Sequence, residues 1–170
     1  MKSPFPNALR QFRLAAHVFG VLLISSLPTA EAQLGKPEGL YYKSWAVIIG
    51  IENYAVAPPL PGVTSDAKKV AESFRRLGFD EVIEFYDKDA SSRRLHQLLH
   101  DMLPRKVGRM DRLVIFYAGH TGFMQDSDGQ ERGYLVPFDA QVNHATKSIT
   151  VEQLKEFTRR SASQAHAVNF

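Results

Sequence analysis

The sequence predicts an α/β domain: a three-layer sandwich in which helices cover both faces of a mainly parallel sheet. Three continuous apolar runs, typical of strands buried on both faces, alternate with segments of helical periodicity. Strand, helix and strand in this order build a parallel sheet through right-handed crossovers. Ligands of such sheets bind beyond the carboxyl ends of the strands, so a functional site is expected in the loops after the three runs.

The first unit extends from residue 45 to Gly78. Residues 45–51 (WAVIIGI) form the first predicted strand, and a proline-rich loop follows it. Thr64 or Ser65 is expected to cap a helix whose apolar residues recur at steps of three and four, and Gly78 is expected to end it.

The second unit repeats this order. Residues 82–86 (VIEFY) predict a strand, and Ser91 or Ser92 is expected to start a helix that stops near Pro104. Residues 113–118 (LVIFYA) predict the third strand.

The rest of the domain is less regular. We expect a glycine-rich loop over 119–133, an extended piece over 134–137 and a third helix capped by Thr150. Residues 165–170 (AHAVNF) begin an alternating pattern that predicts the opening of another strand, so the sheet is expected to be incomplete at the C-terminus.

The N-terminal residues predict export. Basic residues precede an apolar stretch over 14–27, and Ala30-Glu31-Ala32 supplies the small residues of a cleavage site. We expect a signal peptide over 1–32, a linker over 33–43 and the domain over 44–170. An uncleaved membrane anchor is the alternative, although it needs about 20 apolar residues. The leader predicts a bacterial protein of the periplasm or exterior, without stable membrane association once the signal is removed.

Composition excludes several classes. The first 32 residues hold three of the 21 basic and one of the 18 acidic residues, so the remainder is almost neutral and nucleic-acid binding is not expected. The chain has no cysteine, which rules out disulfides and thiolate metal sites within it. No G-x-G-x-x-G, P-loop or G-x-S-x-G motif is present, which disfavours nucleotide-binding proteins and serine hydrolases.

His120 follows the third predicted strand and lies between Gly119 and Gly122. This position aims the ring into the crevice at the sheet edge, and we expect the glycines to let a substrate backbone approach. Histidine suits a general base because its unperturbed pKa of about 6.5 allows proton exchange near neutral pH. A loop histidine that makes ordinary turn hydrogen bonds is the alternative.

Four segments in order resemble the caspase-like cysteine peptidases, particularly the metacaspase and bacterial caspase-like branch. They are WAVIIGIENY (45–54), LPGVTSDA (60–67), RLVIFYAGHTG (112–122) and GYLVPFDA (133–140). The resemblance implies a caspase-hemoglobinase fold, protein or peptide substrates and a cysteine-type endopeptidase with a Cys-His dyad, in which His120 is the catalytic histidine.

The nucleophile of that dyad is missing from the sequence. In the family the cysteine follows the strand after the third helix, so the resemblance implies a chain truncated just before it. A non-catalytic, peptide-binding or regulatory pseudopeptidase is the alternative. Either way, this chain alone cannot perform the acylation step.

The resemblance assigns two further roles. Thr121 stands where the family usually has glycine, and its N–H would donate to the oxyanion. Asp66 matches a carboxylate of the specificity pocket that selects Arg or Lys before the scissile bond, although an acidic residue near a helix N-terminus is also favoured by the helix dipole. Tyr54 and Asp139 are expected to shape the crevice, without a chemical role.

No metal site is predicted. Asp126-Ser127-Asp128-Gly129 lacks the spacing and closing glutamate of an EF-hand, so an Asp-Gly turn is expected there, although the resemblance allows calcium activation. His96 and His100 lie one helical turn apart without a third ligand. The arginines around the second helix are expected to form a solvated face.

Overall fold

A computed structural model describes residues 41–142 and 145–163, with only the backbone given for 158–163. The predicted signal peptide (1–32), most of the predicted linker (33–43) and the predicted strand opening at 165–170 lie outside the described residues. Among the described helices, none is long and apolar enough to cross a membrane.

The centre of the domain is a parallel sheet of three strands. β1 (Ser44–Gly50) lies between β2 (Glu81–Tyr86) and β3 (Arg112–Ala118), in the order β2-β1-β3. Every residue of β1 is buried, which explains its unbroken apolar run. In the register, Gly50 faces Tyr86 and Ala118, so all three strands end at the same edge of the sheet.

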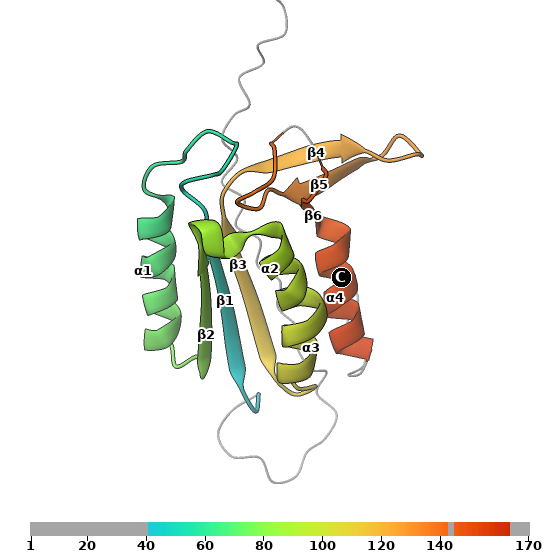
Figure 1. Cartoon of the computed structure of the whole chain (residues 1–170). Helices are drawn as coiled ribbons and strands as arrows, with labels where there is room; N and C mark the ends of the chain where they lie inside the picture. The colour runs from blue at the N-terminus through green and yellow to red at the C-terminus, as the bar shows by residue number, and fades with distance from the viewer. Residues whose placement is uncertain (1–40, 143–144, 164–170) are drawn as a thin grey trace, which may run out of the picture.

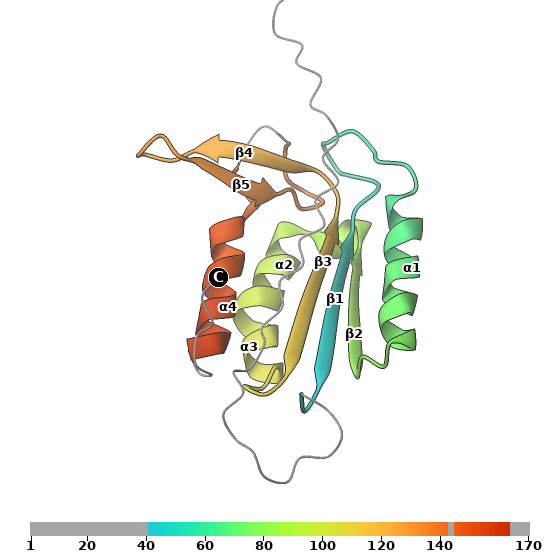
Figure 2. The same cartoon turned by 180° about the vertical axis from the view of Figure 1, so that it is seen from behind.

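Helices cover both faces of this sheet, as the sequence predicts (Figures 1 and 2). α1 (Val63–Arg76) packs on one face, where Ala67 and Ala71 meet Ala46 and Ile48. The other face is covered by α2 (Ser92–Gln97), α3 (Leu103–Lys106) and α4 (Val151–Ser163). The fold class is therefore a three-layer α/β sandwich.

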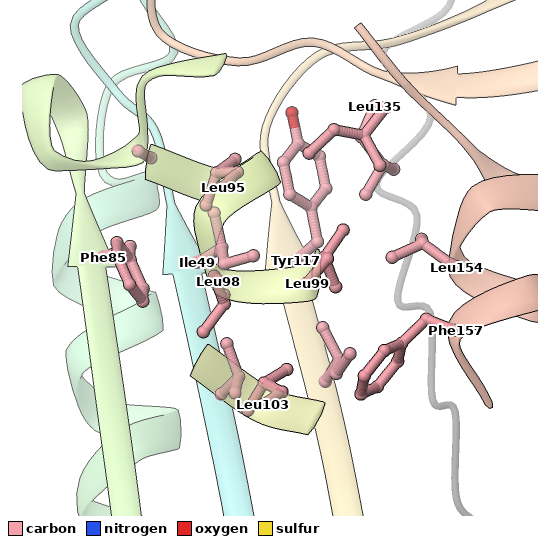
Figure 3. Packing of buried hydrophobic residues seen from close by; sticks show 14 of the residues in the cluster. Ile49, Phe85, Leu95, Leu98, Leu99, Leu103, Tyr117, Leu135, Leu154 and Phe157 are labelled. Carbon is pink, nitrogen blue, oxygen red and sulfur yellow. The ribbon is translucent and has the colours of Figure 1, made fainter. Parts of the chain in front are cut away.

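The larger core cluster lies between β1, β3 and the second helical layer (Figure 3). Leu95, Leu98 and Leu103 contribute from the α2–α3 segment, while Leu154 and Phe157 contribute from α4. Tyr117 belongs to this cluster and is 1% exposed. Its hydroxyl points towards the strand ends, where the candidate site lies (Figure 3).

The start of α1 differs from the prediction. Gly62, in the left-handed region at φ +90°, precedes the helix, and Thr64 and Ser65 lie within its first turn instead of capping it. The prediction was wrong because a left-handed glycine turns the chain into the helix here, and the N–H of Thr64 donates to the side chain of Glu52 at 3.3 Å. At the other end, Gly78 has φ +75° and ends the helix as predicted.

The second helical segment is longer than predicted. Ser91 precedes α2 as expected. After α2 the chain forms a π-helical segment, η2 (Leu98–Met102), and then α3, which contains Pro104 and ends at Lys106. Pro104 lies in the first turn of α3. A proline is tolerated at this position because the first turn of a helix requires no hydrogen bond from its backbone nitrogen.

A second, antiparallel sheet lies beyond the ends of the parallel strands. It contains β4 (Thr121–Gln125), β5 (Glu131–Leu135) and β6 (Ile149–Thr150), in the order β4-β5-β6. The expectation of a loop over 119–133 was wrong, because cross-strand pairing converts most of this segment into a hairpin. Thr150 caps α4 as predicted: its Oγ1 accepts the N–H of Gln153, whose side chain accepts the N–H of Thr150.

Candidate active site

His120 lies between β3 and β4, at the edge of the parallel sheet predicted to carry the site. Its side chain is partly buried, so it is neither sealed in the core nor fully solvated. The main chain is held on both sides: the carbonyl oxygen accepts the N–H of Val136 at 3.0 Å, and the N–H donates to the Tyr54 hydroxyl at 2.7 Å.

One ring nitrogen of His120 is committed to the loop after β1. Nε2 lies 2.8 Å from the carbonyl oxygen of Pro58. A carbonyl oxygen only accepts, so Nε2 must carry the proton and Nδ1 is the basic nitrogen of the neutral ring. Among the described residues, no hydrogen bond to Nδ1 is formed, so this atom is free to accept a proton from a reacting group.

Two tyrosines surround His120. The ring of Tyr54 lies 4.9 Å from the imidazole, centroid to centroid, with the planes tilted by 49°. The hydroxyl of Tyr117 donates to the carbonyl oxygens of His120 and Val136, at 2.7 and 2.9 Å. The two hydroxyl oxygens lie 3.4 Å apart, which links the loop after β1 to the end of β3.

The glycines beside His120 leave space that tyrosine side chains of the protein occupy. A Cβ on Gly119 would lie 2.5 Å from the Tyr54 hydroxyl and 2.6 Å from the Tyr117 hydroxyl, and a Cβ on Gly122 would overlap the ring of Tyr134. The approach of a substrate backbone to these glycines stays a prediction.

Asp87 fixes the loop that carries Tyr54 and Pro58. It follows β2 with φ +45°, and its Oδ1 accepts the N–H groups of Glu52 and Asn53 at 2.8 and 2.9 Å. Partial burial acts to raise the pKa of Asp87, but the hydrogen bonds outweigh it and the pKa lies below its ordinary value. The loop is also held where Ala55 N–H donates to the Phe138 carbonyl.

In the described part of the chain, no hydrogen bond or ion pair joins Asp66 or Thr121 to the imidazole. α1 begins at the same edge of the sheet (Figure 1). Asp66 lies in its first turn, but the side chain is 67% exposed and paired with Lys69 at 2.9 Å. Thr121 is the first residue of β4 and pairs with Leu135, so its main chain belongs to the hairpin.

Several other polar residues have structural partners. Asp139 accepts the N–H of Ser92 at 2.7 Å and so anchors the start of α2. Asp126 accepts the N–H groups of Asp128 and Gln130 and pairs with Arg132, which lowers its pKa, the Gln130 N–H having the largest effect. The predicted Asp-Gly turn is present, and its principal carboxylate is occupied by the protein.

In the described part of the chain, no three His, Cys, Asp or Glu residues are grouped so that they could hold a metal ion. His96 and His100 lie as a stacked pair, with ring centroids 5.8 Å apart. Arg94 and Arg105, from the basic segment, form ion pairs with Asp89 and Asp101 on the surface.

The model of a known family, described as the caspase domain, matches residues 43–162, which is well over half of the chain. The chain belongs to the caspase-domain family. This match and the resemblance of the four sequence segments agree, and the family is one of peptidases. No curated protein matches the chain.

A solved structure shares the fold of this caspase domain. It is the crystal structure of protein GSU0716 from Geobacter sulfurreducens, with a TM-score of 0.55 and 18% sequence identity. The match covers 68% of this chain and 44% of that one, so the chain corresponds to less than half of the solved protein's length. At this identity the likeness concerns the fold alone.

Sequence reasoning missed most of what surrounds His120 in this caspase domain. Tyr54 was expected only to shape the crevice, and Tyr117 and Pro58 were not singled out. Tyr117 carried a signal, since a tyrosine hydroxyl in an apolar strand must find a polar partner. Pro58 carried none, because its contribution is a main-chain carbonyl, which every residue type supplies.

Proposed function

We propose that this caspase domain carries the histidine of a cysteine endopeptidase of the metacaspase or bacterial caspase-like kind. The supporting observation is the state of the His120 ring: Nε2 is tied to the Pro58 carbonyl, and Nδ1 has no hydrogen bond among the described residues. A ring held in one tautomer, with its basic nitrogen free beside the strand ends, suits a general base.

In the proposed reaction, Nδ1 of His120 takes the proton from a cysteine thiol. The thiolate attacks the scissile carbonyl carbon, and the imidazolium then gives that proton to the leaving amine as the C–N bond breaks. Water, deprotonated by the same nitrogen, releases the acyl group and regenerates the thiol. The 170 residues include no cysteine, so the proposed nucleophile lies outside the sequence given.

The remaining roles are also proposals. Thr121 would contribute an oxyanion N–H, and Asp66 would select a basic residue before the scissile bond, provided that substrate displaces Lys69 from it. Calcium would act as an activator by resemblance only. The leader over 1–32 would direct the protein to the periplasm or exterior.

The test uses the full reading frame that contains this sequence. We expect it to encode a cysteine shortly after residue 170, and the purified protein to cleave peptides after Arg or Lys. His120→Ala should lower kcat by about a hundredfold or more, because general acid–base catalysis contributes about 10²–10⁴-fold. His100→Ala, at an exposed position, is the matched control and should leave kcat unchanged. A full-length protein that has the cysteine and cleaves no peptide would contradict the proposal.

A second function is favoured by the cysteine count of zero: a non-catalytic caspase-like module that binds peptides for recognition or regulation. Peptide binding that survives His120→Ala, without hydrolysis by the full-length protein, would support this module over the peptidase.

A further inference from the structure

We infer that Tyr54 and Tyr117 are positioning residues that hold the backbone and ring of His120 in one arrangement. Tyr54 lies in the loop after β1, and Tyr117 is the penultimate residue of β3. The inference has two parts. The geometric part, that the tyrosines hold the His120 ring in place, stands by itself, whereas the catalytic part, that this placement raises kcat, rests on the proposed peptidase function.

The hydrogen bonds around His120 have a single consistent direction. The His120 N–H donates to the Tyr54 oxygen. The Tyr117 proton is used on the carbonyls of His120 and Val136, so Tyr117 can only accept from Tyr54 across the 3.4 Å between their oxygens. The chain of donors thus leaves the His120 N–H, passes through both hydroxyls and returns to the His120 carbonyl.

The surroundings keep this ring of hydrogen bonds intact. Burial is the main cause that raises the pKa of both Tyr54 and Tyr117, so both hydroxyls keep the protons that the network needs. Gly119 allows both oxygens to approach the main chain, where any Cβ would collide with them. A buried polar network of this kind stabilises one arrangement because each group would otherwise lose its partner.

The same two tyrosines limit the movement of the imidazole. The Tyr54 ring lies against it, and the Tyr54 and Pro58 contacts come from one loop. Fixing the His120 main chain, one face of its ring and its Nε2 leaves Nδ1 pointing in one direction. Catalysis is sensitive to such placement, since a misplacement of about 1 Å can cost about a hundredfold in rate.

The geometric part is tested in the 170-residue chain by NMR of the His120 side chain. We expect slow solvent exchange of the Nε2 proton in the unaltered chain, and exchange faster by about fivefold in Tyr54→Phe and more in Tyr54→Leu, which also lacks the ring. Tyr134→Phe is the matched control. It too removes a hydroxyl that donates to a main-chain carbonyl, that of Val142 at 2.6 Å, but this hydroxyl forms no hydrogen bond with His120 or Tyr54 in the described part of the chain.

The catalytic part is tested in the full reading frame. We expect kcat to fall about tenfold in Tyr54→Phe and Tyr117→Phe and about a hundredfold in Tyr54→Leu, with KM nearly unchanged and Tyr134→Phe close to the unaltered enzyme. If Tyr117→Phe fails to fold, the two Tyr54 variants decide, because Tyr54 is only partly buried.

The two parts separate the possible failures. Exchange rates in the Tyr54 variants that match those of Tyr134→Phe would overturn the inference. An inactive full-length enzyme with altered exchange in the Tyr54 variants would contradict the peptidase function and leave the positioning role supported.

Discussion

Nε2 of His120 lies 2.8 Å from the carbonyl oxygen of Pro58, a residue 62 positions earlier in the chain. The contact requires a proton on Nε2, so the neutral imidazole should exist as one tautomer. Long-range ¹H–¹⁵N NMR at alkaline pH should show the Nε2–H form alone for His120. Exposed His100 should show the mixture found in solution, and an Nδ1–H signal from His120 would contradict the structure.

Gly119→Ala should destabilise the domain and disturb its candidate site. The new methyl would lie 2.5 Å from the Tyr54 hydroxyl and 2.6 Å from that of Tyr117. Such overpacking costs about 1–3 kcal/mol, measured as the free energy of unfolding in denaturant.

Gly133→Ala provides the control for that change. Its Cβ would lie at ordinary contact distances, 3.4 Å from Val151 and 3.7 Å from Phe123. We expect a change in unfolding free energy within about 0.5 kcal/mol. Equal effects of the two substitutions would show that the tyrosine hydroxyls do not crowd Gly119.

Asp87 should make stability depend on acid pH. Its folded-state pKa lies below the unfolded value of about 3.9, so its contribution is complete above that value and is lost as pH falls through the folded pKa. Asp87→Asn should lower the unfolding free energy at pH 7 by about 1.5 kcal/mol and flatten the acid part of the profile. The measurement is denaturant unfolding at several pH values.

Asp89→Asn is the matched change on the same 3₁₀ turn, η1 (Asp87–Ala90). Asp89 forms an exposed ion pair with Arg94, and such pairs contribute little. We expect a change of about 0.5 kcal/mol or less. If Asp89→Asn changed the dependence of unfolding free energy on acid pH more than Asp87→Asn did, Asp87 would not be the cause of that dependence.

Asp66 and Lys69 should have opposite effects on the proposed specificity. In the full-length protein, Asp66→Asn should lower kcat/KM for Arg substrates by about tenfold or more, because a charge-assisted hydrogen bond is lost. Lys69→Ala should raise it, because Lys69 competes for the same carboxylate at 2.9 Å.

Glu72→Gln, which affects an exposed ion pair with Arg76 on the same helix, should leave kcat/KM unchanged. Stability should hardly change in any of the three variants, since these ion pairs are exposed. If Asp66→Asn retains full selectivity for Arg, the pocket role of Asp66 is refuted.

The parallel layer of the fold could be predicted because its signals are local. The run at residues 45–51 is apolar throughout, and β1 is buried at every position. Gly78 ended the predicted helix through its own backbone freedom, at φ +75°. The hairpin over 121–135 was missed because its glycines weaken the strand pattern and its pairing partners lie outside each short segment.

The site could be predicted only in part, for the same physical reason. His120 was found because its position after a buried strand is a local feature. The partners of His120 come from other segments: Tyr54 and Pro58 from the loop after β1, and Val136 from the chain beyond β5. The roles of Asp66 and Thr121 stay predictions.

The pairing of β1 with β3 has a consequence for how the protein forms. Its register joins residues 44–50 to residues 112–118, so the chain must close a long loop before Tyr54 meets Tyr117. Contacts of such high sequence separation form late and slowly. His120 follows β3 in the chain, so its basic nitrogen gains a fixed orientation only after β3 has paired with β1 and the loop that carries Tyr54 has closed over it.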